Sequence, residues 1–415
     1  GAYMWTSRKN DLYNYSVKDG PYAPQFFSDK PGSDPFSPDK FDIGPVTDAN
    51  GNHTFSVQKF YQNYGLPTDH SIGLSTLKAG YLMLDYAIVP ALRFSGGLRI
   101  EQANIHTDVA QFDSLGLPRD DLRRFVQDYG IVNAGNLNQT SVLPSAGLIY
   151  KVRNDELSPI LVRVNFSQTV ARPSMRELSG VAAYDYELRD MVNGNPDLKM
   201  VQINNYDVRF ESYFKSGDNV SLSVFYKDFK NHIELVQFDP YGFFWMNNTN
   251  KSWLRGIELE GRKALLNHFE VRANVSLVDS RTTFVKQFTL TNGTKEFGET
   301  VTHTMYGQAP WVFNGIFAYT LDSIGFSAAL SYNIQGPKLV IEGGAGLPAV
   351  YERSRNLLDL TLSKTLGRHF IITGKVRNLL NAATVRSYKF DQGYMLDYDR
   401  YSYGTTYVLS LTYRI

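Results

Sequence analysis

The last nine residues of the chain, 407–415, are YVLSLTYRI, and apolar and polar side chains alternate along them. Tyr407, Leu409 and Leu411 fall on one side of an extended chain, while Ser410 and Thr412 fall on the other. Successive side chains of a β-strand point to opposite faces, whereas a helix repeats about every 3.6 residues. The segment is therefore predicted to be a strand with one apolar and one polar face.

The same alternation recurs along the whole chain, for example at 92–101, 271–277 and 326–333. We count about fourteen such segments, and many are longer than the roughly five or six residues usual in soluble strands. They lie near residues 1–17, 71–89, 92–109, 139–151, 159–170, 202–214, 219–238, 251–263, 268–285, 308–321, 324–338, 354–366, 369–388 and 403–415. The sequence therefore predicts an all-β protein.

The connections between these strands alternate in length. Short turns are predicted at 90–91, 152–158, 215–218, 264–267, 322–323 and 367–368. Long loops are predicted at 18–70, 110–138, 171–201, 239–250, 286–307, 339–353 and 389–402. Bacterial outer-membrane barrels combine short periplasmic turns with long extracellular loops. We therefore predict a transmembrane antiparallel β-barrel that occupies residues 1–415 as one domain, with the long loops outside the cell.

Composition excludes several other classes of protein. The 415 residues carry 42 Lys and Arg against 41 Asp and Glu, so the chain has no electrostatic footprint for nucleic acid. The absence of cysteine excludes disulfides, thiolate metal sites and a cysteine nucleophile. No apolar run approaches the roughly 18 to 20 residues of a membrane-spanning helix. A membrane protein that crosses the bilayer with β-strands is not excluded. Its strands alternate apolar and polar residues, so the mean hydropathy of the chain is ordinary.

Charged residues occupy one face of several predicted strands. Glu258 and Glu260 alternate with Ile257 and Leu259, for example. Burying unpaired charge is prohibitive, so such a face needs water or polar protein opposite it. We predict a lumen wall made of Arg93, Arg99, Glu101, Asp207, Arg209, Glu211, Glu258, Glu260 and Arg262. The alternative is a soluble barrel or sandwich in which these charges are solvated.

Some long loops carry local signals. Residues 118–130 have Pro118 at a helix start and Gly130 at its end, which predicts a short amphipathic helix, and 56–64 is a second candidate. Loop aromatic residues are predicted either to stack on a ligand or to form an interfacial girdle. The candidate ligand-binding residues among them are Tyr241, Phe243, Phe244, Trp245, Tyr398 and Tyr401.

Catalytic and metal motifs are absent from the sequence. The seven histidines form no metal-ligand spacing, and there is no GxSxG motif. Glu258 and Glu260 imitate an acid–base couple, but a lumen wall also accounts for them. Asp397 and Asp399 are either solvated loop carboxylates or weak candidates for Ca²⁺. We predict neither an enzyme, nor a cofactor, nor a metal site.

Several sequence motifs are more specific than the alternation, and their order along the chain is informative. They are FSQTVARPSMREL at 166–178, NGNPDLK at 193–199, WLRGIELE at 253–260, GQAPWVFN at 307–314, VRNLLN at 376–381 and the closing YVLSLTYRI. Together they resemble the C-terminal barrel of TonB-dependent outer-membrane transporters, in the form common among Bacteroidetes. DPFSPDKFDIG at 34–44 extends the resemblance toward the N-terminus.

The resemblance implies a barrel of about 22 strands filled by an N-terminal plug. The strands of this sequence match about the last fourteen, so we expect a fragment, with a split receptor or a genuine smaller barrel as alternatives. Segment 1–17 is then expected to pair with a strand outside this sequence rather than with 403–415.

The resemblance also implies a function, the TonB-dependent import of a scarce or bulky ligand across the bacterial outer membrane. The expected partners are membrane lipids and lipopolysaccharide, the TonB complex through a segment outside this chain, and a surface lipoprotein. A structural or docking barrel in a larger assembly and a passive porin are the alternative functions. The substrate cannot be read from the residues.

Overall fold

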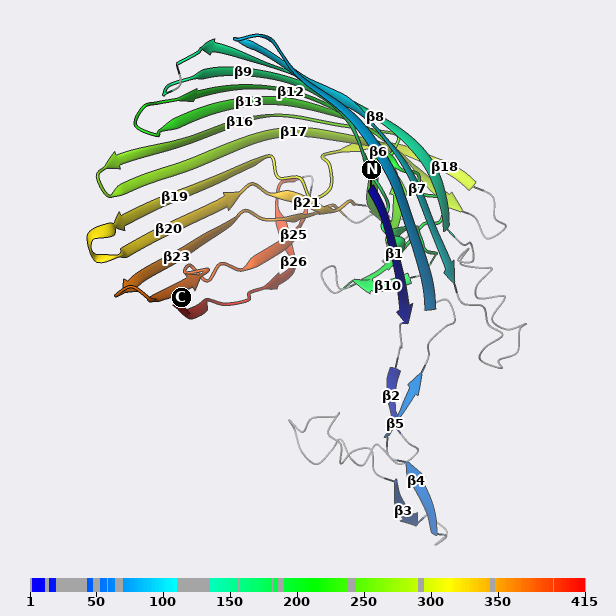
Figure 1. Cartoon of the computed structure of the whole chain (residues 1–415). Helices are drawn as coiled ribbons and strands as arrows, with labels where there is room; N and C mark the ends of the chain where they lie inside the picture. The colour runs from blue at the N-terminus through cyan, green and yellow to red at the C-terminus, as the bar shows by residue number, and fades with distance from the viewer. Residues whose placement is uncertain are drawn as a thin grey trace.

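A computed structural model describes residues 2–11, 15–19, 43–47, 53–57, 59–63, 70–109, 135–155, 157–180, 182–185, 190–237, 244–289, 295–343, 348–390 and 392–414. Fourteen strands of this part form one antiparallel, curved sheet (Figure 1). In sheet order they are β1 (Ala2–Asp11), β6 (His70–Val89), β7 (Leu92–Val109), β8 (Gly135–Arg153), β9 (Ile160–Ala171), β12 (Val201–Tyr213), β13 (Asn219–Lys230), β16 (Lys251–Leu266), β17 (Phe269–Thr289), β19 (Trp311–Leu321), β20 (Phe326–Gln335), β23 (Arg355–Leu366), β24 (Phe370–Arg377) and β27 (Thr406–Tyr413).

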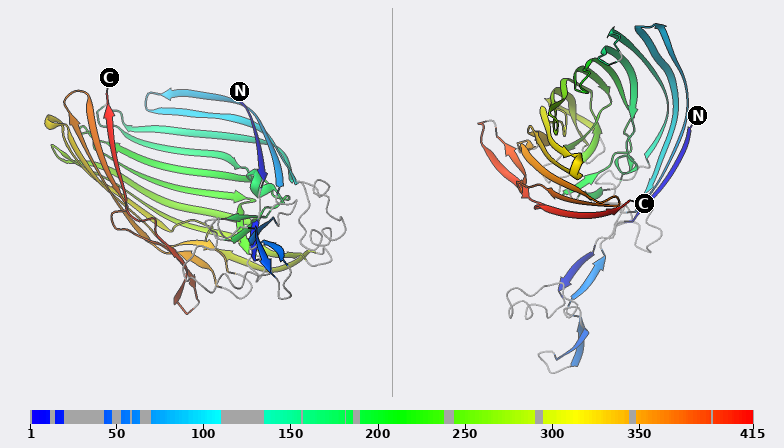
Figure 2. Two further views of the ribbon diagram at one scale, coloured as in Figure 1. Left: turned by 90° about the horizontal axis from the view of Figure 1, so that it is seen from below. Right: turned by 60° about the vertical axis from the view of Figure 1, so that its left-hand side comes forward.

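The predicted all-β architecture is confirmed, since each of the fourteen predicted segments overlaps one strand of this sheet. Figure 2 shows the sheet from two further sides, curved like the wall of a barrel. β1 pairs with β6, and β27 pairs with β24. Within the described residues β1 and β27 are the two ends of the sheet and do not pair with each other, which agrees with the expectation drawn from the resemblance. Pairing of 1–17 with a strand outside this sequence stays a prediction.

One face of the sheet carries a continuous row of apolar side chains. Its members are cross-strand neighbours, so they point to the same side. Several of them are about half exposed, including Val164 at 48% and Leu277 at 54%. The row consists of Tyr86, Phe94, Leu148, Val164, Val208, Val224, Ile257 and Leu277. An exposed apolar band of this kind suits contact with lipid hydrocarbon.

The predicted short turns connect neighbouring strands of the sheet. Between β19 and β20 the chain passes through the 3₁₀ helix η5 (Asp322–Ile324) and Gly325, whose φ of 61° favours glycine. At the turn after β12, Asp218 accepts hydrogen bonds from the Ala264 backbone N–H (2.7 Å) and the Ser216 hydroxyl (2.8 Å). These bonds, with the nearby Lys263 ammonium, lower the pKa of the Asp218 carboxyl to about 2. Asp218 thus joins two adjacent turns.

The predicted long loops contain further strands that form smaller sheets. One sheet consists of β10 (Ala182–Asp185), β11 (Asp190–Asn193), β15 (Phe244–Asn248) and β14 (Ile233–Gln237). A second consists of β21 (Lys338–Ile341), β22 (Val350–Glu352), β25 (Thr384–Lys389) and β26 (Met395–Tyr401). β18 (Lys295–His303) extends the main sheet by pairing with β17, and α2 (Met175–Leu178) is a single helical turn. β2 (Tyr15–Asp19) pairs with β5 (Lys59–Asn63), and β3 (Ile43–Thr47) pairs with β4 (His53–Val57).

Three predictions need correction or comment. The helix predicted at 56–64 is wrong, because pairing of β5 with β2 outweighs a weak local pattern in a segment rich in aromatic residues. The strands predicted at 219–238 and 369–388 are each divided in two, at Asn231 (φ 57°) and Asn378 (φ 53°), where left-handed backbone ends the strand. The helix predicted at 118–130 lies outside the described residues. No helix of the described part is long and apolar enough to cross a membrane.

The two faces of the sheet can be distinguished by substituting neighbours on β20. Leu330 pairs with Phe317 and Leu360 on the apolar face, whereas Ser331 pairs with Ile316 and Asp359 on the other. We expect Leu330→Arg to cost about 2 to 4 kcal/mol of barrel stability in lipid, because arginine would enter hydrocarbon. Ser331→Arg should cost far less, since Asp359 lies opposite. Urea unfolding in vesicles, followed by heat-modifiable gel mobility, measures both; equal losses would refute the assignment of faces.

Candidate functional site

The nine charged residues predicted as a lumen wall lie on one face of the sheet. The cross-strand register runs from Arg93 through Ile149, Arg163, Arg209 and Ser223 to Glu258. The other six lie an even number of residues from Arg93, Arg209 or Glu258 on the same strands, so they share this face. It is the face opposite to the apolar row. Their common face agrees with the alternation, and their role as a lumen wall stays a prediction.

Arg209 is the centre of an ion-pair network on this face. Its Nε donates to Glu211 (2.7 Å) and its Nη2 donates to Glu260 (3.1 Å). Arg163 donates to the other oxygen of Glu211 at 3.0 Å. Glu211 is only 8% exposed, so its charge depends on these two guanidinium groups. The network joins strands β9, β12 and β16.

An amide ladder continues the polar face toward β20. The Asn333 amide donates to the Asn314 carbonyl oxygen (2.5 Å), and the Asn314 amide donates to that of Asn274 (2.8 Å). A hollow of about 300 Å³ lies beside it, with Glu260, Arg262 and Arg272 among its lining residues. Arg262 and Arg272 both pair with Glu270. The hollow presents charged and amide groups, which can hold water, polar protein or a hydrophilic solute.

Arg93 and Glu258 of the wall also have side-chain partners. Arg93 forms a two-point ion pair with Asp85 at 2.6 Å, and the Ser276 hydroxyl donates to Glu258 at 3.3 Å. Asp207 lies beside Asn165 and Phe225 in the register. The Arg93–Asp85 pair neutralises charge within the wall itself, whereas the Ser276 hydroxyl leaves the charge of Glu258 in place.

Glu101, the most buried wall residue on β7, fixes the start of a long loop. It pairs with Arg99 at 2.5 Å and with Arg172, which lies just after β9. Two residues further on, Ser174 and Glu177 form a capping box at α2, each side chain bonding the backbone N–H of the other. The motif FSQTVARPSMREL therefore anchors its loop to the face of the sheet that carries the wall.

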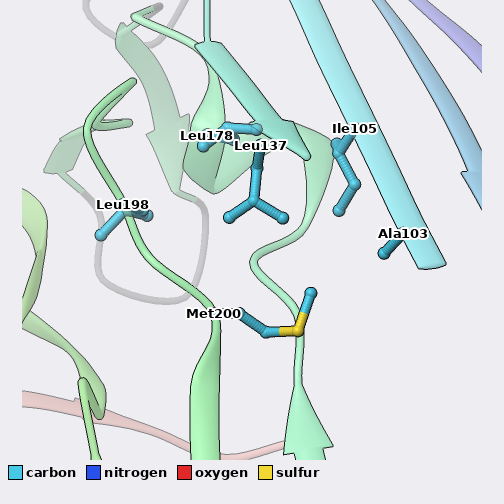
Figure 3. Packing of buried hydrophobic residues seen from close by; sticks show 6 residues of the cluster. All are labelled: Ala103, Ile105, Leu137, Leu178, Leu198 and Met200. Atoms are coloured by element: carbon cyan, nitrogen blue, oxygen red, sulfur yellow. The ribbon is translucent and has the colours of Figure 1, made fainter. Parts of the chain in front are cut away.

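A hydrophobic cluster completes this anchor (Figure 3). Leu178 of α2 is fully buried and faces the strand residues of β7 and β8. The buried members are Ala103, Ile105, Leu137, Leu178, Leu198 and Met200. Gly194 of the NGNPDLK motif runs so close to α2 that a Cβ atom would meet the Ser179 carbonyl oxygen. Both motifs thus act through packing.

The loop aromatics predicted to bind ligand are only partly within the described residues. Tyr241 and Phe243 lie outside them, and Phe244 and Trp245 are described only as backbone of β15. Tyr398 packs against a second buried cluster, which contains Val192, Leu235, Val340, Ile341 and Val350. The Tyr401 ring lies 5.6 Å from the guanidinium carbon of Arg386. These contacts account for both rings as packing, and ligand binding by the six aromatics stays a prediction.

The two loop aspartates on β26 are ion-paired. Arg353 donates to Asp397 at 2.7 Å, and Arg386 lies 3.5 Å from Asp399. Arg386 is 1% exposed, so this pairing belongs to the interior of the second small sheet. The alternative of solvated loop carboxylates is therefore wrong for Asp399, because burial of Arg386 brings its counter-ion inside.

Sequence reasoning missed a buried group of acids and histidines. Glu234 of β14 is 3% exposed and accepts hydrogen bonds from the Thr282 hydroxyl (3.0 Å) and the Tyr306 backbone N–H (3.1 Å). Burial raises the pKa of the Glu234 carboxyl. Burial, with His303 nearby, lowers the pKa of His232 to about 4. These residues come from separate loops, so no spacing in the sequence reveals them.

Other wall residues could have been found from the sequence. Arg163 follows the same alternation on β9 as the predicted charges on β12. Asn274, Asn314 and Asn333 carry no charge, so a search for charged faces passes over them.

Comparison with known proteins identifies the family of this chain. The profile described as "TonB dependent receptor-like, beta-barrel" matches residues 3–379. No curated protein matches the chain. Among solved structures, the siderophore receptor PiuA from Acinetobacter baumannii superposes with a TM-score of 0.57 at 12% identity, over 89% of this chain and 50% of that one.

Two further solved structures give the same fold. The ferric-catecholate import receptor Fiu from E. coli K12 superposes with a TM-score of 0.55 at 12% identity, over 90% of this chain and 50% of that one. The copper transporter OprC superposes with a TM-score of 0.53 at 12% identity, over 89% and 52%. The chain thus spans about half the length of these proteins. It belongs to the TonB-dependent receptor β-barrel family, whose members are receptors of the bacterial outer membrane rather than enzymes.

Proposed function

We propose that this chain is the barrel part of a receptor that imports a scarce or bulky ligand across the outer membrane, driven by the TonB complex. The observation that carries the proposal is the ion-paired, amide-lined face around Arg209 on a sheet whose opposite face is apolar. A barrel filled by a polar plug needs such a wall, because charges on it must meet water or polar protein. PiuA, Fiu and OprC are described as two receptors and a transporter, which supports import as the class of function.

The arrangement in the membrane is part of the proposal. The short turns face the periplasm and the long loops, with their two small sheets, face outside. The sheet is part of a barrel of about 22 strands around a plug, in which the other strands lie between β1 and β27. The apolar row contacts lipid, and lipopolysaccharide surrounds the outer rim. The motifs NGNPDLK and WLRGIELE favour the Bacteroidetes form, in which a surface lipoprotein is a further partner.

A passive porin accounts less well for the loops. α2 and the buried clusters around Leu178 and Val350 fill space on the polar side of the sheet with apolar side chains. An open water-filled pore gains nothing from packing there, whereas a ligand-gated entrance needs ordered loops.

Labelling of single cysteines tests the orientation in a chain that has no native cysteine. Ser216 and Gln392 are both exposed. Ser216 lies in the short turn between β12 and β13, whereas Gln392 lies in the turn between β25 and β26, within a predicted long loop. We expect Gln392→Cys to react with a membrane-impermeant maleimide on intact cells, and Ser216→Cys to react only after the outer membrane is opened. The reverse pattern would invert the topology.

The wall can be tested through the stability of the barrel. We expect Arg209→Met to lower the free energy of unfolding by about 1 to 3 kcal/mol, because Glu211 and Glu260 both lose a charged partner. Adding Glu211→Gln should restore part of that loss. Lys263→Met is the matched control, since Lys263 is an exposed partner of Asp218 and should cost at most about 1 kcal/mol. Equal costs for Arg209→Met and Lys263→Met in a urea titration would argue against an internal network.

Growth on limiting nutrients tests import. Strains lacking the receptor gene, or lacking TonB, are compared on a panel of ferric chelates, copper and other scarce nutrients. We expect at least one nutrient to support growth only when both receptor and TonB are present. Growth on that nutrient that needs the receptor but survives loss of TonB would indicate a passive porin instead.

A further inference from the structure

The apolar face of the sheet has a groove close to two of its short turns. The groove has a volume of about 580 Å³, within the range of about 300 to 1,000 Å³ that is usual for ligand sites. It lies where β12 and β16 end and where β13 and β17 begin, and the turns after β12 and β16 are side by side (Figure 1). Its apolar lining residues are Phe214, Val220, Leu259, Val271 and Val275. We call it the apolar groove.

The register places this groove on the face of the apolar row rather than on the wall. Leu259 is two residues from Ile257, and Val275 is two residues from Leu277, and both of these partners belong to the row. Leu259 and Val275 are also cross-strand neighbours of each other. Leu259 is 50% exposed. The groove is therefore part of the surface that contacts lipid hydrocarbon in the proposed barrel.

Two small residues form the floor of the groove. Gly261 and Ala273 are cross-strand neighbours, and larger side chains stand two residues away from each of them on both sides. Within the described part of the chain, and apart from its chain neighbours, a Cβ atom at Gly261 would have only the Asn219 carbonyl oxygen within 4 Å, at 3.7 Å. The space above the floor is thus open, and a side chain could be added there without displacing the backbone.

One end of the groove is polar and carries an excess of positive charge. Ser216, Asp218 and Lys263 line this end, and Lys215 is an exposed residue of the same turn as Ser216. The Lys263 ammonium donates to Asp218 at 3.0 Å, and its side chain is 66% exposed. An ammonium group has three N–H donors, so Lys263 can bind Asp218 and an anion together. Two ammonium groups face one carboxylate at this rim.

We propose that the apolar groove binds one acyl chain of an anionic phospholipid, whose phosphate lies at Lys263. An amphiphile matches both parts of the site, because its tail needs apolar contact and its anionic head is attracted to cations at the membrane surface. An apolar segment of a second protein would fill the groove but would leave the excess positive charge at the rim without a counter-charge.

The leaflet follows from the orientation of the barrel, so this inference rests on the proposed function. In that orientation the short turns face the periplasm, and the head group lies in the inner leaflet of the outer membrane. The ligand is then a phospholipid rather than lipopolysaccharide, which surrounds the outer rim at the other end of the strands. The lipid is a resident of the barrel surface, distinct from the ligand that the receptor imports.

Native mass spectrometry tests the proposal on the whole receptor, delipidated in detergent and titrated with phosphatidylglycerol. We expect one lipid to bind tightly. Gly261→Leu should weaken this binding about tenfold or more, because leucine on the floor displaces methylene groups of the chain. Lys263→Gln should weaken it about fivefold and should leave the weaker binding of phosphatidylcholine unchanged. Heat-modifiable gel mobility shows that each variant is folded.

Gly80→Leu is the matched control. Gly80 is an exposed glycine on the same face, paired with Ile100 on β7. An added Cβ atom would contact nothing within 4 Å among the described residues, and Gly80 lies outside the groove. This variant should bind phosphatidylglycerol as the wild type does. Equal binding by Gly261→Leu and Gly80→Leu would overturn the proposal.

Photocrosslinking locates the lipid. Phosphatidylglycerol with a diazirine in one acyl chain should label residues 259–263 and 271–275 of the wild-type receptor, and Gly261→Leu should remove this labelling. Labelling spread evenly over the apolar row, a receptor dimer in place of the lipid, or tighter binding of lipopolysaccharide than of phosphatidylglycerol would each overturn the proposal. These measurements need neither TonB nor an imported nutrient, so their failure is distinguishable from a failure of the import proposal in the growth experiment.

Discussion

A bilayer offers no water to the peptide groups that cross it, and this constraint governs the whole sheet. Every N–H and C=O in the hydrocarbon region has to be paired with a neighbouring strand. The unbroken antiparallel ladder meets that demand between β1 and β27, each of which is paired on one side only within the described residues. Because the ladder fixes the backbone, side chains can only alternate, and one face becomes apolar while the other becomes polar.

The polar face follows from the same constraint. Strands that are long enough to cross the membrane carry polar residues at about half of their positions, so charge accumulates on the face opposite to the apolar row. The chain limits the cost by pairing charges across strands, as Arg209 does with Glu211 and Glu260, and by using amides where charge is not needed. The loops then pack against this face through Glu101, Arg172 and the cluster around Leu178.

The sequence allows the main sheet to be predicted because alternation is local. Leu409 and Ser410 reveal their faces without knowledge of any other strand. The strand breaks at Asn231 and Asn378 could not be predicted in this way. The left-handed backbone of these asparagines does not change the alternation of apolar and polar residues. Residues that are an even number of positions apart on one strand share a face. The charged face can therefore be predicted from the sequence, whereas the contact between Arg209 and Glu260 cannot be predicted. The buried group of His232, Glu234 and His303 depends on how separate loops fold together, and no spacing along the chain encodes that.

The row of Asn274, Asn314 and Asn333 has a direction. Each amide nitrogen donates to the next carbonyl oxygen, from β20 through β19 to β17. If one amide turned over, N–H would face N–H on one side and oxygen would face oxygen on the other, so the three side chains must reverse together or not at all. The nitrogen end of the row lies at Asn274, the cross-strand neighbour of Glu260. A negative charge on the strand next to the nitrogen end favours this orientation of the three amides over the reverse one.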